Sequence, residues 1–339
     1  MRVLIVGGTG LISTAITRQL LERGDEVTLL NRGRTPSRIP EGAAILRGDR
    51  HDRQRFVEQM RGLPEQDAVI DMICYSAADA QDDIAAFAGR VRQLVFCSTV
   101  DVYTRPASRY PYREDEPFGP LSDYAAGKVA CERLFAEAHA RGDLAVTTLR
   151  PAHTYGEGGT IIHSLGWSTR YIDRMRKGKP IIVHGDGQSL WVSCHVDDVA
   201  RAFVSALGNE RSLGRAYHVT GEEWRTWNRY HEEVAIALGV PLPELVHIPT
   251  DLLVRAAPRE AGICGPNFQY PTIFDNAAAR EDLGFRITVP WVDGVRRTVA
   301  WLDAHGRVEP SGPDDLDDRI IAAWRRLSDA LVSEAGAAT

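Results

Sequence analysis

Strand-sized apolar runs alternate with amphipathic helical patterns over the first 150 residues, and this rhythm constrains the fold more than any other feature. Arg2–Val6 is a short apolar run closed by glycines, and Leu11–Arg23 follows with apolar residues at helical spacing. The later strand-like runs are Glu26–Leu30, Ala43–Leu46, Ala68–Met72, Gln93–Cys97 and Leu144–Leu149, and the later helical patterns are Ala77–Ala88 and Tyr124–Arg141. This alternation predicts an α/β fold with a doubly wound parallel sheet covered by helices on both faces.

The rhythm changes after Arg150–Pro151, where segments become shorter and richer in glycine and tryptophan. The expected elements are a strand at Ile181–Val183, a helix capped by Thr226 that runs to Leu238, and helices at Ile161–Arg176, Asp198–Leu207, Asp275–Leu283, Val292–Ala304 and Asp317–Glu334. We therefore expect a first domain over residues 1–150, with 181–208 as a candidate return to it. A smaller C-terminal α/β domain is expected mainly over 151–307, and a helical extension over 308–339.

Composition excludes several functional classes. The net charge of −6 argues against a dedicated nucleic-acid binder, which usually carries a basic face. No apolar run approaches the ~20 residues that span a bilayer, and the N-terminus has no signal-peptide pattern. The five cysteines form no CxxC pair, and the histidines show no HExxH spacing. We expect a cytoplasmic protein with reduced cysteines, no metal site and no membrane partner.

A glycine-rich turn, Gly7-Gly8-Thr9-Gly10, joins the first predicted strand to the first predicted helix. A dinucleotide site needs a tight turn at this point, close approach of the backbone to a pyrophosphate, and helix N–H groups aimed at it. Gly7 and Gly10 suit the first two requirements. The third small position is Ser13 rather than glycine, which still permits close packing of the helix on the strand. The turn therefore predicts nucleotide binding.

The end of the second strand discriminates between the two nicotinamide cofactors. An acidic residue there binds the adenosine ribose of NAD, but this chain has Asn31-Arg32-Gly33-Arg34. This segment has no carboxylate that would repel a 2′-phosphate. Arg32 and Arg34 offer charge-assisted hydrogen bonds to such a phosphate. We therefore favour NADP(H), with NAD(H) as the alternative if both arginines are solvated loop charges. Asp49, after the third strand, is a candidate acceptor for the adenine amino group or a cap of its own loop.

Tyr124 and Lys128 stand four residues apart at the start of a long helix, so they share one helix face. A nearby ammonium favours the phenolate and lowers the pKa of a tyrosine toward a range usable for proton transfer. The chain contains three lysines and 37 arginines, so a lysine retained at this spacing is informative. Ser98-Thr99 follows the fifth strand, at the carboxyl edge where open α/β sheets bind ligands.

Taken together, these motifs resemble those of the extended short-chain dehydrogenases/reductases, in the NAD(P)-dependent epimerase/dehydratase family. The matching segments, in order, are GGTGLIS, STVDVY, YAAGK, RPAHTYG and HVDDVA. The resemblance implies a Rossmann-type domain with a smaller C-terminal substrate domain, catalysis by Thr99, Tyr124 and Lys128, and a homodimer made through two helices of each subunit. NRGRT also resembles a subgroup that includes chloroplast stem-loop RNA-binding proteins. The further expected cofactor contacts are Leu11, Ile12, Arg50, Ser98 and Pro151.

The chain departs from the family where nucleotide sugars are handled. Sugar-nucleotide dehydratases carry an Asp-Glu pair after the catalytic threonine, where this chain has Val100 and Asp101, so Asp101 is a tentative acid/base. Trp191 stands where relatives place a diphosphate-binding arginine, and a second such arginine is absent from 262–274. The tentative substrate contacts are Thr99, Asp101, His153, Tyr155, Trp167 and Trp191, the aromatic ones as a floor for a sugar face or as core packing. His195, Asp197 and Asp198 are interpreted as structural, with the aspartates capping the next helix.

Three functions remain open. We prefer a sugar epimerase that oxidises a secondary alcohol to a ketone and reduces it again from the other face, acting on a sugar, a glycoside or an atypical nucleotide sugar. The alternative is an NADPH-dependent ketoreductase of a sugar or natural-product ketone, which the Asn31-Arg32 signature favours. A non-catalytic RNA-binding protein is the third interpretation, and the Tyr124–Lys128 pair and the acidic charge oppose it.

Overall fold

The computed structural model describes residues 1–33, 39–313 and 315–336 and divides them into two compact units. Unit 1 comprises Met1–Tyr155, Val192–Glu223 and Phe274–Val289, and unit 2 comprises Gly156–Trp191, Trp224–Ile273 and the chain from Pro290. The first crossing therefore lies five residues after the expected boundary. The segments that return to unit 1 are 192–223 and 274–289 rather than 181–208, and the C-terminal extension is part of unit 2.

A seven-stranded parallel sheet in the order β11-β6-β5-β4-β1-β2-β3 forms the centre of unit 1. Its strands are β1 (Arg2–Val6), β2 (Glu26–Asn31), β3 (Ala44–Arg47), β4 (Ala68–Asp71), β5 (Gln93–Cys97), β6 (Val146–Pro151) and β11 (Ala216–Val219). The predicted doubly wound α/β fold is thus confirmed. β1 and β4 are neighbours although two strands separate them in sequence, so the strand order reverses between them, where such sheets bind ligands.

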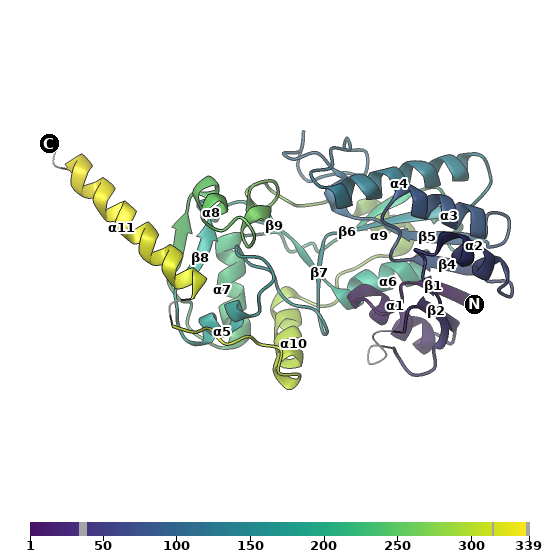
Figure 1. Cartoon of the computed structure of the whole chain (residues 1–339), viewed down its shortest axis with the longest axis horizontal. Helices are drawn as coiled ribbons and strands as arrows, with labels where there is room; N and C mark the ends of the chain where they lie inside the picture. The colour runs from purple at the N-terminus through teal and green to yellow at the C-terminus, as the bar shows by residue number, and fades with distance from the viewer. Residues whose placement is uncertain (34–38, 314, 337–339) are drawn as a thin grey trace. The chain divides into compact units, whose positions relative to one another are not determined.

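Helices cover both faces of this sheet (Figure 1). They are α1 (Leu11–Glu22), α2 (Arg53–Arg61), α3 (Ala77–Phe87), α4 (Asp123–Ala140), α6 (Val196–Ala206) and α9 (Ala277–Leu283). Alternate residues of β1 serve the two faces. Val3 and Ile5 pack into the apolar cluster shared with α1, α6 and α9, whereas Leu4 and Val6 pack into the one shared with α2, α3 and α4. Burial on both faces explains why the strands are continuous apolar runs.

Unit 2 is smaller and is built around aromatic side chains. Parallel β8 (Ile181–His184) and β13 (Leu245–Ile248) form one strand pair, and antiparallel β9 (Leu190–Trp191) and β12 (Arg225–Thr226) form another. Its helices are α5 (Arg170–Arg176), α7 (Trp227–Leu238), α8 (Thr250–Ala256), α10 (Trp291–Ala304) and α11 (Leu316–Gly336). The hydroxyl of Thr226 accepts a hydrogen bond from the Arg229 N–H at 3.2 Å, which confirms the predicted cap of α7.

The expected helix at Ile161–Arg176 is wrong over its first half, since α5 begins only at Arg170. Ile161 and Ile162 are buried as a helix pattern would have them, but they lie in an irregular segment. Gly158 and Gly166 take positive φ values of 92° and 86° around it, a conformation that a regular helix excludes. Helices α2 and α8 are short and were not expected.

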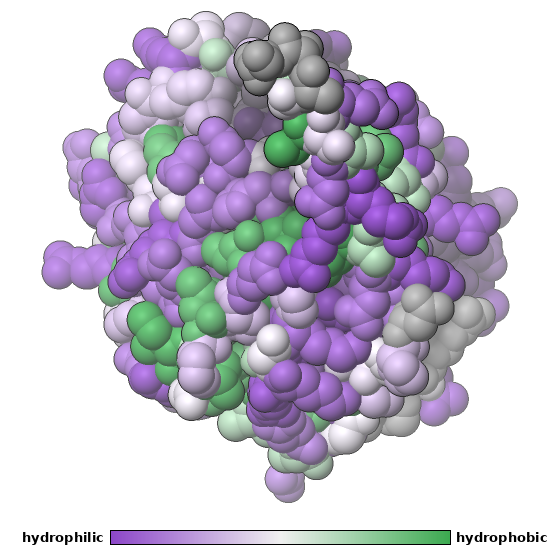
Figure 2. Space-filling view, turned by 90° about the vertical axis from the view of Figure 1, so that its left-hand side faces the viewer, coloured by the Kyte–Doolittle hydropathy of each residue, from purple (hydrophilic) through white to green (hydrophobic). Residues whose placement is uncertain are grey.

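The C-terminal extension is attached to unit 2 by charges. Buried Arg174 of α5 pairs with Asp315 at 2.7 Å and with Asp318 at 2.8 Å, and Lys179 pairs with the other oxygen of Asp318. The second half of α11 is exposed, as is the side chain of Leu331. The face drawn in Figure 2 is mostly hydrophilic, with separate hydrophobic patches. Among the described residues, no helix is both long and apolar enough to cross a membrane.

Candidate active site

A cavity of about 670 Å³ lies at the carboxyl edge of the sheet, and all of its lining residues belong to unit 1. The predicted cofactor and catalytic residues that line it are Gly7, Gly10, Leu11, Ile12, Asn31, Arg32, Asp49, Arg50, Ser98, Thr99, Tyr124, Lys128 and Pro151. Arg34 lies outside the described residues. The structure therefore brings together residues from Gly7 to Pro151, in a space large enough for a dinucleotide-sized ligand.

The glycine turn packs closely against Ile73 at Gly7, whereas Gly10 has open space around it on the side of the cavity. Gly7 has a φ of 91°, and a Cβ there would lie 2.6 Å from the side chain of Ile73. At Gly10, the residue that begins α1, a Cβ would meet only the Ser13 hydroxyl within 4 Å. Ser13 accepts a hydrogen bond from the Gly10 N–H at 2.8 Å. The N-terminus of α1 therefore faces the cavity without side-chain cover, which suits a pyrophosphate group.

Asn31, at the end of β2, presents a donor to this cavity. Its Oδ1 accepts the Gly33 N–H at 2.8 Å, which fixes the orientation of the amide. Its Nδ2 is buried and has no hydrogen-bond partner among the described residues. A buried donor without a partner is costly, so the site fits a ligand that brings an acceptor oxygen to this point.

Arg50 lines the cavity but does not offer it a free positive charge. Its guanidinium is buried, forms an ion pair with Asp71, and donates to Asp83 at 3.0 Å and to the Asp79 carbonyl at 3.0 Å. Burial, together with the charge of Asp71, raises the pKa of Asp83. Arg50 therefore stabilises an acidic cluster at the cavity, and its expected contact with the cofactor stays a prediction. Asp49 accepts the N–H of His51 at 3.1 Å and so caps its own loop.

Tyr124 and Lys128 both reach the cavity from the first turns of α4. Ser122 begins this helix by accepting the Ala125 N–H at 3.2 Å. Lys128 is 1% exposed, and its ammonium donates to the Cys97 carbonyl at 2.6 Å. Thr99, which begins a short 3₁₀ turn after β5, forms a hydrogen bond with the Tyr124 phenol.

The expected lowering of the Tyr124 pKa is not present in this state. Desolvation by the surrounding protein raises the pKa of the phenol, and the nearby Cys97 and Asp101 add to it. The Thr99 hydrogen bond acts in the opposite direction but is the smaller effect. The Nζ of Lys128 donates to the Cys97 carbonyl and lies 5.9 Å from the centre of the Tyr124 ring.

The carboxylate of Asp101 is paired with an arginine, and its tentative acid/base role stays a prediction. Its carboxylate accepts a hydrogen bond from buried Arg105 at 2.9 Å, and its N–H donates to the Thr99 hydroxyl at 3.2 Å. It is not among the residues that line the cavity. Asp101 therefore braces the turn that carries Thr99.

The tentative substrate residues do not form one exposed aromatic floor. Tyr155 is buried against the ring of His195, and Trp191 is 4% exposed and packs against Trp227 and Phe268 in the core of unit 2. Burial removes both rings from solvent, so these two rings follow the core-packing alternative rather than forming a sugar floor. Trp167, at 54% exposure, remains accessible. The Nδ1 of His153 and the Ser193 hydroxyl are hydrogen-bonded at 2.9 Å, and burial lowers the His153 pKa to about 4.

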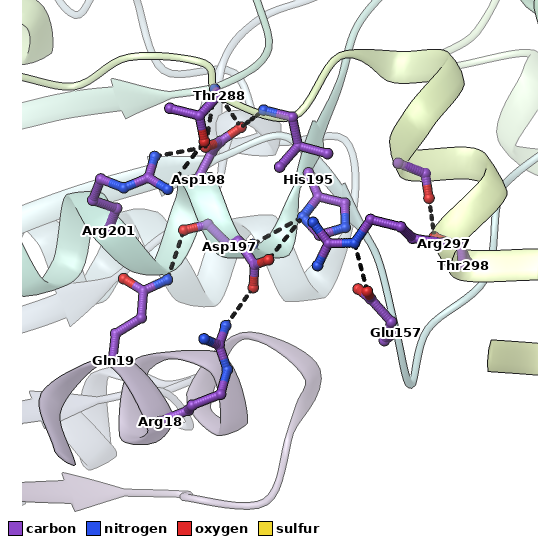
Figure 3. Close-up of polar contacts among 12 residues, drawn as sticks. Arg18, Gln19, Glu157, His195, Asp197, Asp198, Arg201, Thr288, Arg297 and Thr298 are labelled. Atoms are coloured by element: carbon purple, nitrogen blue, oxygen red, sulfur yellow. Dashed lines mark hydrogen bonds and ion pairs between the residues drawn. The ribbon is translucent and has the colours of Figure 1, made fainter. Parts of the chain in front are cut away.

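The segment around His195, Asp197 and Asp198 is structural (Figure 3). His195 begins α6, and its Nδ1 accepts the Asp197 N–H at 3.2 Å, so the histidine is the cap rather than either aspartate. Asp198 is buried and accepts hydrogen bonds from the backbone N–H groups of Thr288 and Val289, each at 3.1 Å. Asp197 pairs with Arg18 of α1 at 2.6 Å. These contacts hold α6 against α1 and against the 288–289 segment.

Sequence reasoning missed several cavity residues, among them His51, Met72, Ile73, Tyr75 and Thr154. Met72, Ile73 and Tyr75 follow β4, at the same carboxyl edge as Ser98 and Thr99. The topological rule that placed Ser98 and Thr99 at the site applies equally to the end of β4. Tyr75 is 46% exposed, and its ring centre lies 6.0 Å from that of Tyr124.

Comparisons with known proteins agree with this geometry. The sequence profile of the NAD dependent epimerase/dehydratase family matches residues 3–220. A 2′-dehydrokanamycin reductase of Streptomyces kanamyceticus is 30% identical over 241 residues, which are 71% of this chain and 68% of the relative. The chloroplast stem-loop binding protein of 41 kDa b of Arabidopsis thaliana is 28% identical over 259 residues, 73% of this chain and 65% of the relative.

Longer alignments lead to the same family. A UDP-glucose 4-epimerase of Streptomyces lividans is 26% identical over 350 residues, covering 93% of this chain and 98% of the relative. The crystal structure of a UDP-glucose 4-epimerase of Thermotoga maritima superposes with a TM-score of 0.72 at 21% identity, over 90% of this chain and 99% of that one, and shows the shared fold. The chain belongs to the NAD dependent epimerase/dehydratase family of NAD(P)-dependent epimerases and oxidoreductases.

Proposed function

We propose that the protein is an NADPH-dependent reductase of a ketone on a sugar or glycoside. The observation that carries this proposal is the buried Asn31 amide, whose Nδ2 has no hydrogen-bond partner among the described residues. Asn31 stands at the position where NAD enzymes carry a carboxylate. The Asn31 amide N–H can donate to an oxygen of a 2′-phosphate, and Arg32 beside it adds positive charge. The kinship with a 2′-dehydrokanamycin reductase supports a polar, glycosidic ketone as the substrate class.

In this proposal, bound NADPH supplies the hydride to the carbonyl carbon. Tyr124 donates its phenolic proton to the carbonyl oxygen, and Thr99 holds the same oxygen through its hydroxyl. Lys128 binds the nicotinamide ribose and stabilises the phenolate once the proton has left. Tyrosine, with an ordinary pKa of about 10, is already protonated at neutral pH, which is the state that a reduction requires, and burial raises the pKa of Tyr124 further. Substrate recognition by unit 2 stays a prediction.

Two measurements test the proposal. Fluorescence titration should show tighter binding of NADPH than of NADH, and the purified protein should oxidise NADPH with keto-sugars or keto-aminoglycosides. Preference for NADH, or turnover of none of these ketones, would contradict it. RNA binding that survives Tyr124→Phe, in the absence of any redox activity, would favour the RNA-binding interpretation.

Epimerisation by transient oxidation is the second candidate. It is supported by the relative from Streptomyces lividans, which aligns over nearly the whole chain. The absence of an arginine at Trp191 and over 262–274 speaks against an ordinary nucleoside-diphosphate sugar. An epimerase would retain a tightly bound oxidised cofactor after purification. Solvent deuterium would not enter the inverted carbon, because the hydride returns from the cofactor.

We also propose a homodimer that forms through the outer faces of α3 and α4. Ala126 and Ala136 are small, exposed residues of α4, and small side chains allow two helices to approach closely. Light scattering should give twice the chain mass, whereas Ala136→Glu should reduce it to one. A monomeric wild-type protein would contradict this arrangement.

A further inference from the structure

Tyr75 lies outside the helical turn from Tyr124 to Lys128 and contacts three of its residues, which are Tyr124, Gly127 and Lys128. A Cβ built on Gly127 would overlap the carbonyl oxygen of Tyr75, so α4 approaches this backbone as closely as only glycine allows. The Tyr75 ring lies beside the Tyr124 ring, at 6.0 Å between centres and an interplanar angle of 52°. The ammonium of Lys128 lies 4.7 Å from the centre of the Tyr75 ring.

The backbone of Tyr75 is itself fixed. Its N–H donates to the Asp79 carboxylate at 2.9 Å, and the Ser76 N–H donates to the same oxygen at 3.0 Å. The Ser76 hydroxyl in turn accepts the Asp79 N–H at 3.2 Å, which completes a capping box at the start of α3. The N–H of Tyr75 is therefore hydrogen-bonded to Asp79 of α3, while its carbonyl oxygen packs against Gly127 of α4.

The surroundings of Lys128 make this ring electrostatically important. Burying an ammonium is costly unless other groups compensate its charge. Among the described residues, the partners of Lys128 are the Cys97 carbonyl and the aromatic rings of Tyr75, Phe96 and Tyr124. The Tyr75 and Phe96 rings are the nearest, at 4.7 and 4.8 Å. Attraction of a desolvated ammonium to a ring face is worth about 3- to 30-fold in an equilibrium constant.

We propose that Tyr75 is a positioning residue that keeps the Lys128 ammonium beside Tyr124. Its ring compensates the buried charge, and its backbone sets the spacing through Gly127. The proposal rests on the proposed function in that it takes Tyr124 and Lys128 as the reacting pair. It requires the aromatic ring of Tyr75 and not its hydroxyl.

The test compares Tyr75→Leu with Tyr75→Phe, using fluorescence titration with NADPH as the first readout. Tyr75→Leu keeps apolar bulk but removes the ring, so the NADPH dissociation constant should rise 3- to 30-fold, and kcat should fall by a similar factor. Tyr75→Phe should stay within twofold of wild type in both. The matched control is Tyr110→Leu, which alters an exposed tyrosine of unit 1 outside the cavity and should change neither value.

Two results would overturn the positioning role. A Tyr75→Leu protein with wild-type affinity and kcat would show that the ring is dispensable, and a Tyr75→Phe protein as impaired as the leucine variant would assign the role to the hydroxyl. A wild-type protein that binds neither NADPH nor NADH would instead refute the proposed function itself. Melting temperatures of all variants should agree within about 2 °C, which separates positioning from misfolding.

Gly127→Ala tests the backbone contact independently. Because the added methyl group overlaps the Tyr75 carbonyl, the Tyr75 backbone must move away from α4. The NADPH dissociation constant should then rise as in Tyr75→Leu, although alanine is the better helix former. Unchanged affinity and kcat in Gly127→Ala would contradict the part of the proposal that concerns spacing.

Discussion

At the scale of single residues, local sequence spacing predicted several of the residues that line the cavity. Gly7 and Gly10 line the cavity because a turn between a strand and a helix is encoded locally, as is the four-residue step from Tyr124 to Lys128. Arg50 could not be predicted in the same way. Its partners Asp71, Asp79 and Asp83 lie 21 to 33 residues away, and only the folded sheet makes them its neighbours.

Tyr124→Phe tests the proton donor. The variant keeps the ring but lacks the hydroxyl, so kcat should fall by about 10²- to 10⁴-fold, the usual contribution of a general acid. The dissociation constant for NADPH, measured by fluorescence titration, should stay within about threefold of the wild-type value, since the ring is retained. A Tyr124→Phe protein that retains turnover would contradict the assignment of Tyr124 as the proton donor.

Asn31→Asp tests the cofactor choice. A carboxylate at this position repels a 2′-phosphate and accepts from ribose hydroxyls, so the preference should move from NADPH toward NADH by at least tenfold. Asn31→Ala is the control, because it removes the buried donor without adding charge. It should weaken NADPH binding while leaving NADH binding nearly unchanged. An unaltered ratio of the two affinities in Asn31→Asp would place the 2′-phosphate elsewhere.

At the scale of elements, the sequence predicted helices and strands best where the apolar pattern was compatible with only one type of secondary structure. The apolar run Gln93–Cys97 matches β5 residue for residue, because burial on both faces demands an uninterrupted run. Over Ile161–Arg176 the apolar spacing also fits a helix, yet the positive φ values of Gly158 and Gly166 belong to an irregular path. Glycine allows that path without imposing it, so periodicity alone does not reveal it.

Asp198→Ala tests the link between α6 and the 288–289 segment. Removing the carboxylate leaves the Thr288 and Val289 N–H groups and the Arg201 guanidinium without their acceptor. The free energy of unfolding in urea should fall by about 2–5 kcal/mol. Asp197→Ala removes the more exposed pair with Arg18 and should cost less than about 1 kcal/mol. Equal losses in the two variants would contradict this ranking.

At the scale of the whole molecule, the sequence indicated two folding regions and located the first crossing between them closely. The later crossings near 191, 223, 273 and 289 were harder to foresee. They occur within short segments, and composition does not change abruptly there. The acidic balance of the chain was visible from composition, whereas the burial of His163, His184 and His231 in unit 2 required the structure.

The burial of these three histidines predicts acid sensitivity. Burial lowers the pKa of His163 to about 3 and that of His184 to about 4, and it also lowers the pKa of His231. These imidazoles are neutral in the fold, so the unfolded chain binds more protons below its own pKa of about 6.5. The contribution of these buried histidines to the free energy of unfolding is therefore fully present above about pH 6.5, and it is lost as the pH falls toward 4. Urea unfolding at pH 7.5 and pH 5 should show a lower midpoint at pH 5, and equal midpoints would refute the prediction.

The scarcity of lysine has a practical consequence for anyone who modifies this protein. Lys128 is 1% exposed, so amine-directed reagents will react with the N-terminus and with Lys177 and Lys179. Those two lysines hold Ser311 and Gly312, just ahead of α11. Acylation would therefore loosen the C-terminal helix while leaving the cavity intact. All five cysteines are buried as free thiols, so a surface cysteine introduced by mutation would be a single, selective attachment point.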